Sequence, residues 1–173
     1  MAARQAPRPG PGVRGALNTA EIPRYALDTA VPLIAQGGPH PRRDACRAAL
    51  ALAVGREVDF RASVELVQEF VFHRLRKTGD PVLAVAQGEA LRALVGLAPF
   101  DETVLDAAQE LIRAGHARGR DAVHAATALR AGIATIVTTD LDFAQIPGLT
   151  ALAPEALVAA HPGPAQPGAP NLS

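Results

Sequence analysis

The sequence predicts an α/β fold in which a central parallel sheet carries helices on both faces. Short apolar runs alternate along the chain with longer segments of helical period, which is typical of such a sheet. The run Ile133–Val137 is rich in β-branched residues, as expected of a strand buried on both faces. Apolar residues make up 49% and charged residues 20% of the 173-residue chain, so length and composition suit one globular domain.

The first half of the chain predicts alternating elements whose ends are marked by capping and breaking residues. Ser63 can cap the helix that follows it, and Gly79 can end that helix. The elements expected before residue 80 are a short apolar run Tyr25–Leu27, a second apolar piece Val31–Ala35, a helix over 41–54, a strand around Val58 and Phe60, and a helix from Ser63 to about Lys77.

The second half continues the alternation. Asp80 and Pro81 form an N-cap followed by proline at the first helical position, and Asp101 can cap the next helix. The elements expected here are a helix from Pro81 to about Val95, a short strand Leu97–Phe100, a helix after Asp101, a break from Gly115 to Gly119, a helix Asp121–Ala131 closed by Gly132, and the strand Ile133–Val137.

Both ends of the chain differ in composition from the middle. Proline and glycine dominate residues 7–15 and 161–173, so we expect flexible tails over 1–23 and 161–173 and a domain over 24–160. No apolar run is long enough to predict a transmembrane helix, and the start of the chain has no apolar core typical of a secretory signal. With only one cysteine, Cys46, the default expectation is a cytoplasmic protein without a disulfide framework.

Four acidic residues stand out by their positions. Asp28 and Asp140 each directly follow or lie just beyond a predicted strand, where parallel sheets place their sites. Glu69 lies beside an apolar helix face, and Asp121 opens the helix that leads into the last predicted strand. Taken singly, each acid suits a turn, a cap or a solvated helix surface. Taken together, converging carboxylates are best compensated by a hard divalent cation such as Mg²⁺, which suits phosphodiester hydrolysis.

Four segments that contain these acids resemble the signature blocks of PIN-domain nucleases, and most closely those of VapC-type toxins of bacterial toxin–antitoxin pairs. Order, spacing and predicted secondary structure all agree over about residues 24–155. The segments are Tyr25-Ala26-Leu27-Asp28-Thr29, Val67-Gln68-Glu69-Phe70, the run from Gly119-Arg120-Asp121 through Ala128-Leu129, and Ile136-Val137-Thr138-Thr139-Asp140-Leu141-Asp142-Phe143.

The resemblance implies a PIN-like α/β/α sandwich and a Mg²⁺- or Mn²⁺-dependent ribonuclease that acts as a toxin. It implies an RNA substrate, a cognate antitoxin protein as partner, and a homodimer. By position, the catalytic quartet is Asp28, Glu69, Asp121 and Asp140, and the expected metal ligands are Asp28, Asp121, Asp140 and Asp142. The sequence does not reveal the RNA target.

Several points stay open. Ala30 stands where the family commonly has Ser or Asn, so we expect Thr29 or Thr138 to supply the missing hydrogen bond. Glu65 lies one turn before Glu69 on the same helical face and competes with it for membership of the quartet. His124 is either a packed helical residue or a substrate contact.

The candidate substrate-binding residues are Thr138 and three cations near a helix end, Arg74, Arg76 and Lys77. These cations also suit the negative end of a helix dipole, so the two interpretations stand side by side. The net charge is zero, with 17 basic and 17 acidic residues, so affinity for nucleic acid must come from such local clusters. The alternative function is a degenerate PIN domain that binds protein or RNA without strong catalysis. Ala30 also argues against a dehalogenase-like phosphatase, which needs a second Asp there.

Overall fold

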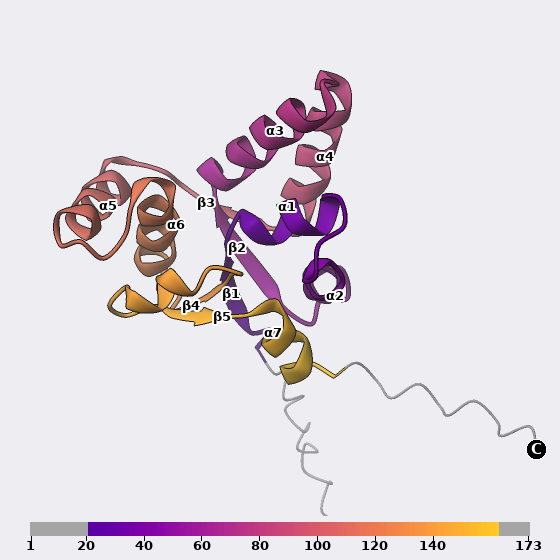
Figure 1. Cartoon of the computed structure of the whole chain (residues 1–173). Coiled ribbons are helices and arrows are strands. Elements are labelled where there is room, and N and C mark those ends of the chain that lie inside the picture. Colours follow the sequence, from indigo (N-terminus) through magenta and orange to yellow (C-terminus); the bar gives the residue numbers. More distant parts are fainter. Residues whose placement is uncertain (1–20, 163–173) are drawn as a thin grey trace, which may run out of the picture.

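Five parallel strands form one sheet in the order β3-β2-β1-β4-β5 (Figure 1). The computed structural model describes residues 21–162. The strands are β1 (Arg24–Leu27), β2 (Asp59–Ser63), β3 (Gly96–Ala98), β4 (Thr135–Val137) and β5 (Thr150–Leu152). On one side of β1 lie β2 and then β3, and on its other side lie β4 and then β5. The strand order therefore reverses between β1 and β4, which is where open α/β sheets bind ligands.

Helices cover both faces of this sheet, which confirms the predicted α/β/α sandwich. They are α1 (Ala30–Gln36), α2 (Arg43–Val54), α3 (Val64–Thr78), α4 (Pro81–Leu94), α5 (Glu102–Arg113), α6 (Gly119–Arg130), the 3-10 helix η1 (Leu141–Gln145) and α7 (Pro154–Ala160). Figure 1 shows α5 and α6 on one side of the sheet and α1, α2, α3, α4 and α7 on the other.

Alternating strand residues feed two separate cores. Leu27 of β1 and Val137 of β4 pack into the core under α1, α2, α3, α4 and α7. Their neighbours Ala26 and Ile136 face the opposite core, under α5 and α6. Both faces of the central strands are therefore apolar, as the continuous apolar runs predicted.

Several helix ends confirm the predicted caps. The Ser63 side chain accepts a hydrogen bond from the backbone N–H of Leu66, and Asp80 and Asp101 cap α4 and α5 in the same manner. Gly79 ends α3 in the left-handed conformation, with φ of 68°. Two strands differ from their predicted limits. Strand Gly96–Ala98 begins one residue before the predicted Leu97–Phe100 and ends two residues before it. Strand Thr135–Val137 lacks the first two residues of the predicted Ile133–Val137.

Two elements near the end of the domain are absent from the sequence-based expectations. Strand β5 spans only three residues and helix α7 only seven, too few for a clear period to show. Both depend on tertiary partners, because β5 pairs with β4 and α7 packs on α2.

The predicted tails fall mostly outside the described residues, since 1–20 and 163–173 are not described. Strand β1 begins at Arg24 and α7 ends at Ala160, so the described elements lie within the predicted domain limits. Between residues 21 and 162, no helix has the length and apolar character that crossing a membrane requires.

Candidate active site

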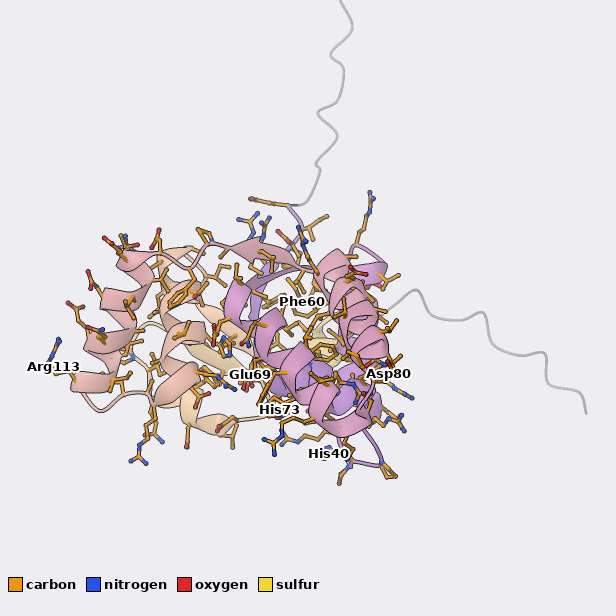
Figure 2. The ribbon with its side chains drawn as sticks, turned by 90° about the horizontal axis from the view of Figure 1, so that it is seen from above. His40, Phe60, Glu69, His73, Asp80 and Arg113 are labelled. Atoms are coloured by element: carbon orange, nitrogen blue, oxygen red, sulfur yellow. The ribbon has the colours of Figure 1, made fainter. Side chains whose placement is uncertain are left out.

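The four predicted acids lie around the carboxyl ends of the central strands. Asp28 directly follows β1, and Asp140 lies three residues beyond β4. Glu69 is on the second turn of α3, and Asp121 is in the first turn of α6. Figure 2 shows Glu69 near the middle of the molecule, whereas Asp80 and Arg113 lie toward its opposite sides.

Asp28 is a buried carboxylate with 5% of its surface exposed. Its Oδ2 accepts a hydrogen bond from the Thr138 hydroxyl at 2.7 Å, and its backbone N–H donates to the Val137 carbonyl at 3.1 Å. Burial raises the pKa of Asp28, although the Thr138 hydrogen bond and the nearby His124 oppose the rise. The fold therefore holds a costly negative charge at the point where the strand order reverses.

Asp121 lies beside the other three acids. Asp121 as a whole is exposed, yet neighbouring groups partly enclose its carboxylate. This desolvation raises the pKa of Asp121. The charge of Asp28 raises that pKa further, as do the charges of Asp140 and Glu69. The charges of the other three predicted acids thus all act on Asp121. No three acidic, histidine or cysteine side chains between residues 21 and 162 are grouped tightly enough to hold one ion between them.

The loop after β4 is organised by Thr138. Its hydroxyl donates to Asp28 and accepts from the Asp140 backbone N–H at 2.9 Å. Asp140 Oδ1 in turn accepts from the Asp142 N–H at 2.9 Å, which begins the 3-10 helix. Both Asp140 and Asp142 are exposed. A cavity of about 230 Å³ lies beside Asp142 and Asp121, with His116, Arg118 and Gln145 among its lining residues.

Glu69 is held by four side chains. Its Oε2 accepts from the Thr29 hydroxyl at 3.0 Å and lies 3.3 Å from His124 Nε2. Its Oε1 lies 2.5 Å from Arg120 Nη1 and 3.5 Å from His73 Nε2. The hydrogen bond from His124, aided by those from Arg120 and Thr29, lowers the pKa of Glu69 to about 2, against the effect of burial.

Comparison with known proteins identifies the fold and its family. A family model described as the PIN domain matches residues 25–149. The chain belongs to the PIN-domain family.

This PIN domain is similar to curated and solved proteins of the VapC type. It is 31% identical over 133 residues to Ribonuclease VapC7 of Mycobacterium tuberculosis, covering 75% of this chain and 91% of that protein. It also shares its fold with the VapBC2 complex of Rickettsia felis, solved bound to a DNA fragment from their promoter. That match has a TM-score of 0.58 and 20% identity, over 75% of this chain and 98% of the other.

A third similar structure is Mycobacterium tuberculosis VapC20, described as a sarcin-ricin loop cleaving toxin. The TM-score is 0.57 at 19% identity, over 69% of this chain and 92% of that one. These comparisons confirm the resemblance to VapC-type PIN domains that the four sequence blocks indicated.

The structure of the PIN domain distinguishes Glu69 from Glu65. Only Glu69 takes part in the hydrogen-bond network with Thr29 and His124, whereas Glu65 lies 3.8 Å from Arg120 Nε as a looser ion pair. The hydrogen bond to Asp28 that Ala30 cannot supply comes from Thr138, which was one of the two expected donors.

Two of the predicted substrate-binding residues have buried side chains that already form hydrogen bonds within the protein. Arg74 is buried between α3 and α4, and its Nε donates to Gln87 Oε1 at 2.7 Å. Thr138 is buried and its hydroxyl is already bonded to Asp28 and Asp140. In this structure these side chains serve packing and the positioning of the acids, and their binding to substrate stays a prediction. Arg76 and Lys77 are exposed in the last turn of α3, about two turns from Glu69.

His124 takes the packed position of its two predicted alternatives, with 4% of its surface exposed. It is nevertheless bonded to polar groups, since its Nδ1 lies 3.0 Å from Ser63 Oγ and its Nε2 lies 3.1 Å from Thr29 Oγ1. Sequence reasoning missed this network and missed Arg120 altogether. The one available signal was the position of Arg120 directly before an acid of the third sequence block.

Proposed function

We propose that this PIN-domain protein is a metal-dependent ribonuclease that hydrolyses RNA phosphodiester bonds as the toxin of a toxin–antitoxin pair. The observation that carries the proposal is the position of Asp28 and Asp140 just beyond β1 and β4, where their charges, with that of Glu69, raise the pKa of Asp121. The similarity to Ribonuclease VapC7 supports the same activity.

The donor set suits a hard divalent cation, Mg²⁺ or Mn²⁺. All of the candidate ligands, Asp28, Asp121, Asp140 and Asp142, offer carboxylate oxygens, and the charges of Asp28 and Asp140 act on Asp121, so a cation there would neutralise them. Mg²⁺ usually binds one or two carboxylates and keeps several waters, so a tight group of three ligands is not required. Bound there, a divalent cation polarises a phosphoryl oxygen and lowers the pKa of a water molecule.

The residues of the chain prepare the site for that chemistry. Thr138 fixes the buried Asp28 carboxylate and the Asp140 backbone together, so that two acids from neighbouring strands keep one geometry. The open cavity beside Asp121 and Asp142 gives a polynucleotide room to approach from the solvent side. Its exposed rim residues His116 and Arg118 add hydrogen-bond donors and positive charge near that approach.

The proposal includes a cognate antitoxin as protein partner, a homodimer and a location in the cytoplasm. The toxin–antitoxin part is supported by the fold shared with VapBC2 of Rickettsia felis and with VapC20, which is described as a toxin. An antitoxin could place an Arg against the acids, and its guanidinium would then occupy the position of the metal charge.

Two experiments test these partners. Co-expression with a neighbouring open reading frame should relieve toxicity and yield a complex on size-exclusion chromatography. Light scattering of the purified chain should give twice its 17.9 kDa mass.

The decisive experiment is cleavage of a labelled single-stranded RNA by purified protein, with Mg²⁺, with Mn²⁺ and with EDTA. We expect cleavage with either metal and none with EDTA. Asp121→Asn should abolish it, whereas Asp106→Asn, at an exposed position of α5 outside the site, should cleave like the wild type. Antitoxin binding without any metal-dependent cleavage would instead support the degenerate, interaction-only alternative.

A further inference from the structure

Arg120 places a positive charge inside the acidic site. It is the second residue of α6 and directly precedes Asp121. Its Nη1 lies 2.5 Å from Glu69 Oε1, and its Nε lies 3.8 Å from Glu65 Oε1. The side chain is 45% exposed, so much of the guanidinium faces solvent at the rim of the site.

Glu69 is committed to this contact by the groups behind it. Its side chain is only 13% exposed, and its Oε2 is taken up by Thr29 and His124. The remaining oxygen, Oε1, faces Arg120 and the more distant His73. A carboxylate held at one oxygen by the protein interior presents its other oxygen in a fixed position, which suits it to hold a guanidinium.

A network of buried hydrogen bonds lies behind Glu69. The single Thr29 hydroxyl proton goes to Glu69 Oε2, so His124 Nε2 must carry a proton to face two oxygens. On its other side, His124 Nδ1 lies 3.0 Å from Ser63 Oγ, which also accepts the Leu66 N–H. Thr29 and His124 therefore hold the Glu69 carboxylate directly, and Ser63 holds His124 in place.

Stability alone does not account for this arrangement. An ion pair with an exposed Arg contributes little to folding, because solvent screens it. Yet three buried side chains, Ser63, Thr29 and His124, are devoted to fixing the carboxylate that holds the guanidinium. A polyanionic substrate also needs a cation where it meets four carboxylates, and the planar guanidinium matches phosphate oxygens.

We propose that Arg120 binds an RNA phosphate next to the scissile bond, and that Glu69, fixed by His124 and Thr29, is the positioning residue for its guanidinium. This inference rests on the proposed ribonuclease function and deepens it. It gives Glu69, besides its place among the four acids, a second role as the anchor of a substrate-binding cation.

The test is RNA binding with metal removed. A fluorescent single-stranded RNA is titrated with protein in EDTA at several NaCl concentrations, and Kd is read from anisotropy. Arg120→Ala should weaken binding about 5- to 10-fold and lower the slope of log Kd against log salt by about 0.7. Arg130→Ala, at the far end of the same helix, should leave both unchanged. Equal or tighter binding by Arg120→Ala would overturn the proposal and indicate a latch that blocks the site.

Two variants that each remove one negative charge distinguish the positioning of the Arg120 guanidinium from a general reduction in the repulsion between the acids and RNA. Asp121→Asn removes a negative charge from the site, so it should tighten RNA binding in EDTA. Glu69→Gln removes a charge a short distance away, yet it should weaken binding, because the guanidinium loses its anchor. Tighter binding by Glu69→Gln would overturn the positioning role. Melting curves of each variant confirm that the compared proteins are folded.

The same proteins distinguish this inference from the function beneath it. Wild-type cleavage with Mg²⁺, together with normal binding and cleavage by Arg120→Ala, would refute the role of Arg120 alone. Wild-type binding without cleavage would refute the ribonuclease and leave the binding data to decide on Arg120. Neither binding nor cleavage of RNA by the wild type would refute both.

Discussion

The Thr138 hydroxyl joins the two strands that flank the reversal of strand order, because it donates to Asp28 Oδ2 at 2.7 Å from the loop that follows β4. Asp28 and Thr138 are 110 residues apart in the chain, and both are buried. A buried carboxylate without donors is costly, so this hydrogen bond, together with those from the backbone of Ala30 and Thr29, helps to stabilise an acid at the end of β1.

Thr138→Val keeps the shape of the side chain and removes the donor. We expect a loss of about 1–3 kcal/mol in the free energy of unfolding at pH 7, because Asp28 remains buried and charged. The pKa of Asp28, already raised, should rise further, so the deficit should shrink as the pH falls and Asp28 becomes protonated. Urea denaturation at pH 5 and pH 7 measures both effects. Thr138→Ser, which keeps the hydroxyl, is the control, and equal stability of Thr138→Val and wild type would contradict the assignment.

Asp140→Asn separates a metal ligand from a structural cap. Asn keeps an oxygen that accepts from the Asp142 N–H, so folding should survive, and lower repulsion of Asp121 should keep the melting temperature at or above that of wild type without metal. RNA cleavage should fall sharply and recover in part at high Mn²⁺ or Mg²⁺. Melting curves and a metal titration of cleavage test this. Full cleavage at limiting metal would remove Asp140 from the metal site.

Acid should weaken the contribution of Glu69 to stability. The folded pKa of Glu69 is about 2, below its ordinary value, so its stabilisation is present above about pH 4.5 and is lost as the pH falls toward 2. The difference in unfolding free energy between wild type and Glu69→Gln should be about 1–2 kcal/mol at pH 7, allowing for the exposed Arg120, and should vanish near pH 2. Asp28 and Asp121 are present in both proteins, so their opposite pH dependence largely cancels. A difference that stays constant from pH 7 to pH 2.5 would contradict the charged network.

Gly88 allows α3 and α4 to pack closely. A Cβ at this position would lie 2.3 Å from Val71 Cγ2, nearer than atoms can pack. Gly88→Ala should therefore destabilise the fold by about 1–3 kcal/mol, although alanine favours helix over glycine by about 1 kcal/mol. Val71→Ala should make Gly88→Ala neutral or stabilising, and a double-mutant cycle by chemical denaturation measures this coupling. Cleavage per folded molecule should not change. Additive effects of the two substitutions would show that the contact is not limiting.

Local signals account for how well the helices and most strands could be predicted. Ser63, Asp80 and Asp101 cap their helices through backbone groups only two or three residues away, so the pattern is readable in sequence. Strand β5 could not be predicted in this way, because three residues carry no period and its partner β4 lies more than ten residues earlier.

The sequence by itself determined which chemistry the chain can carry. The alternation of short apolar runs and capped helices specifies a parallel sheet, and acids just beyond two of its strands specify one edge for the site.

Only the tertiary structure decided which side chains contact one another and what role each of them has. Arg120 meets Glu69 across 51 residues, and His124 meets Ser63 across 61. Such contacts depend on the rotation of α6 against α3 and on the packing beneath them, since a helix residue shifted by one position turns about 100° away. Burial then decided that Arg74 and Thr138 stabilise the fold and the acids, while the exposed Arg120 was left facing the solvent from which RNA would come.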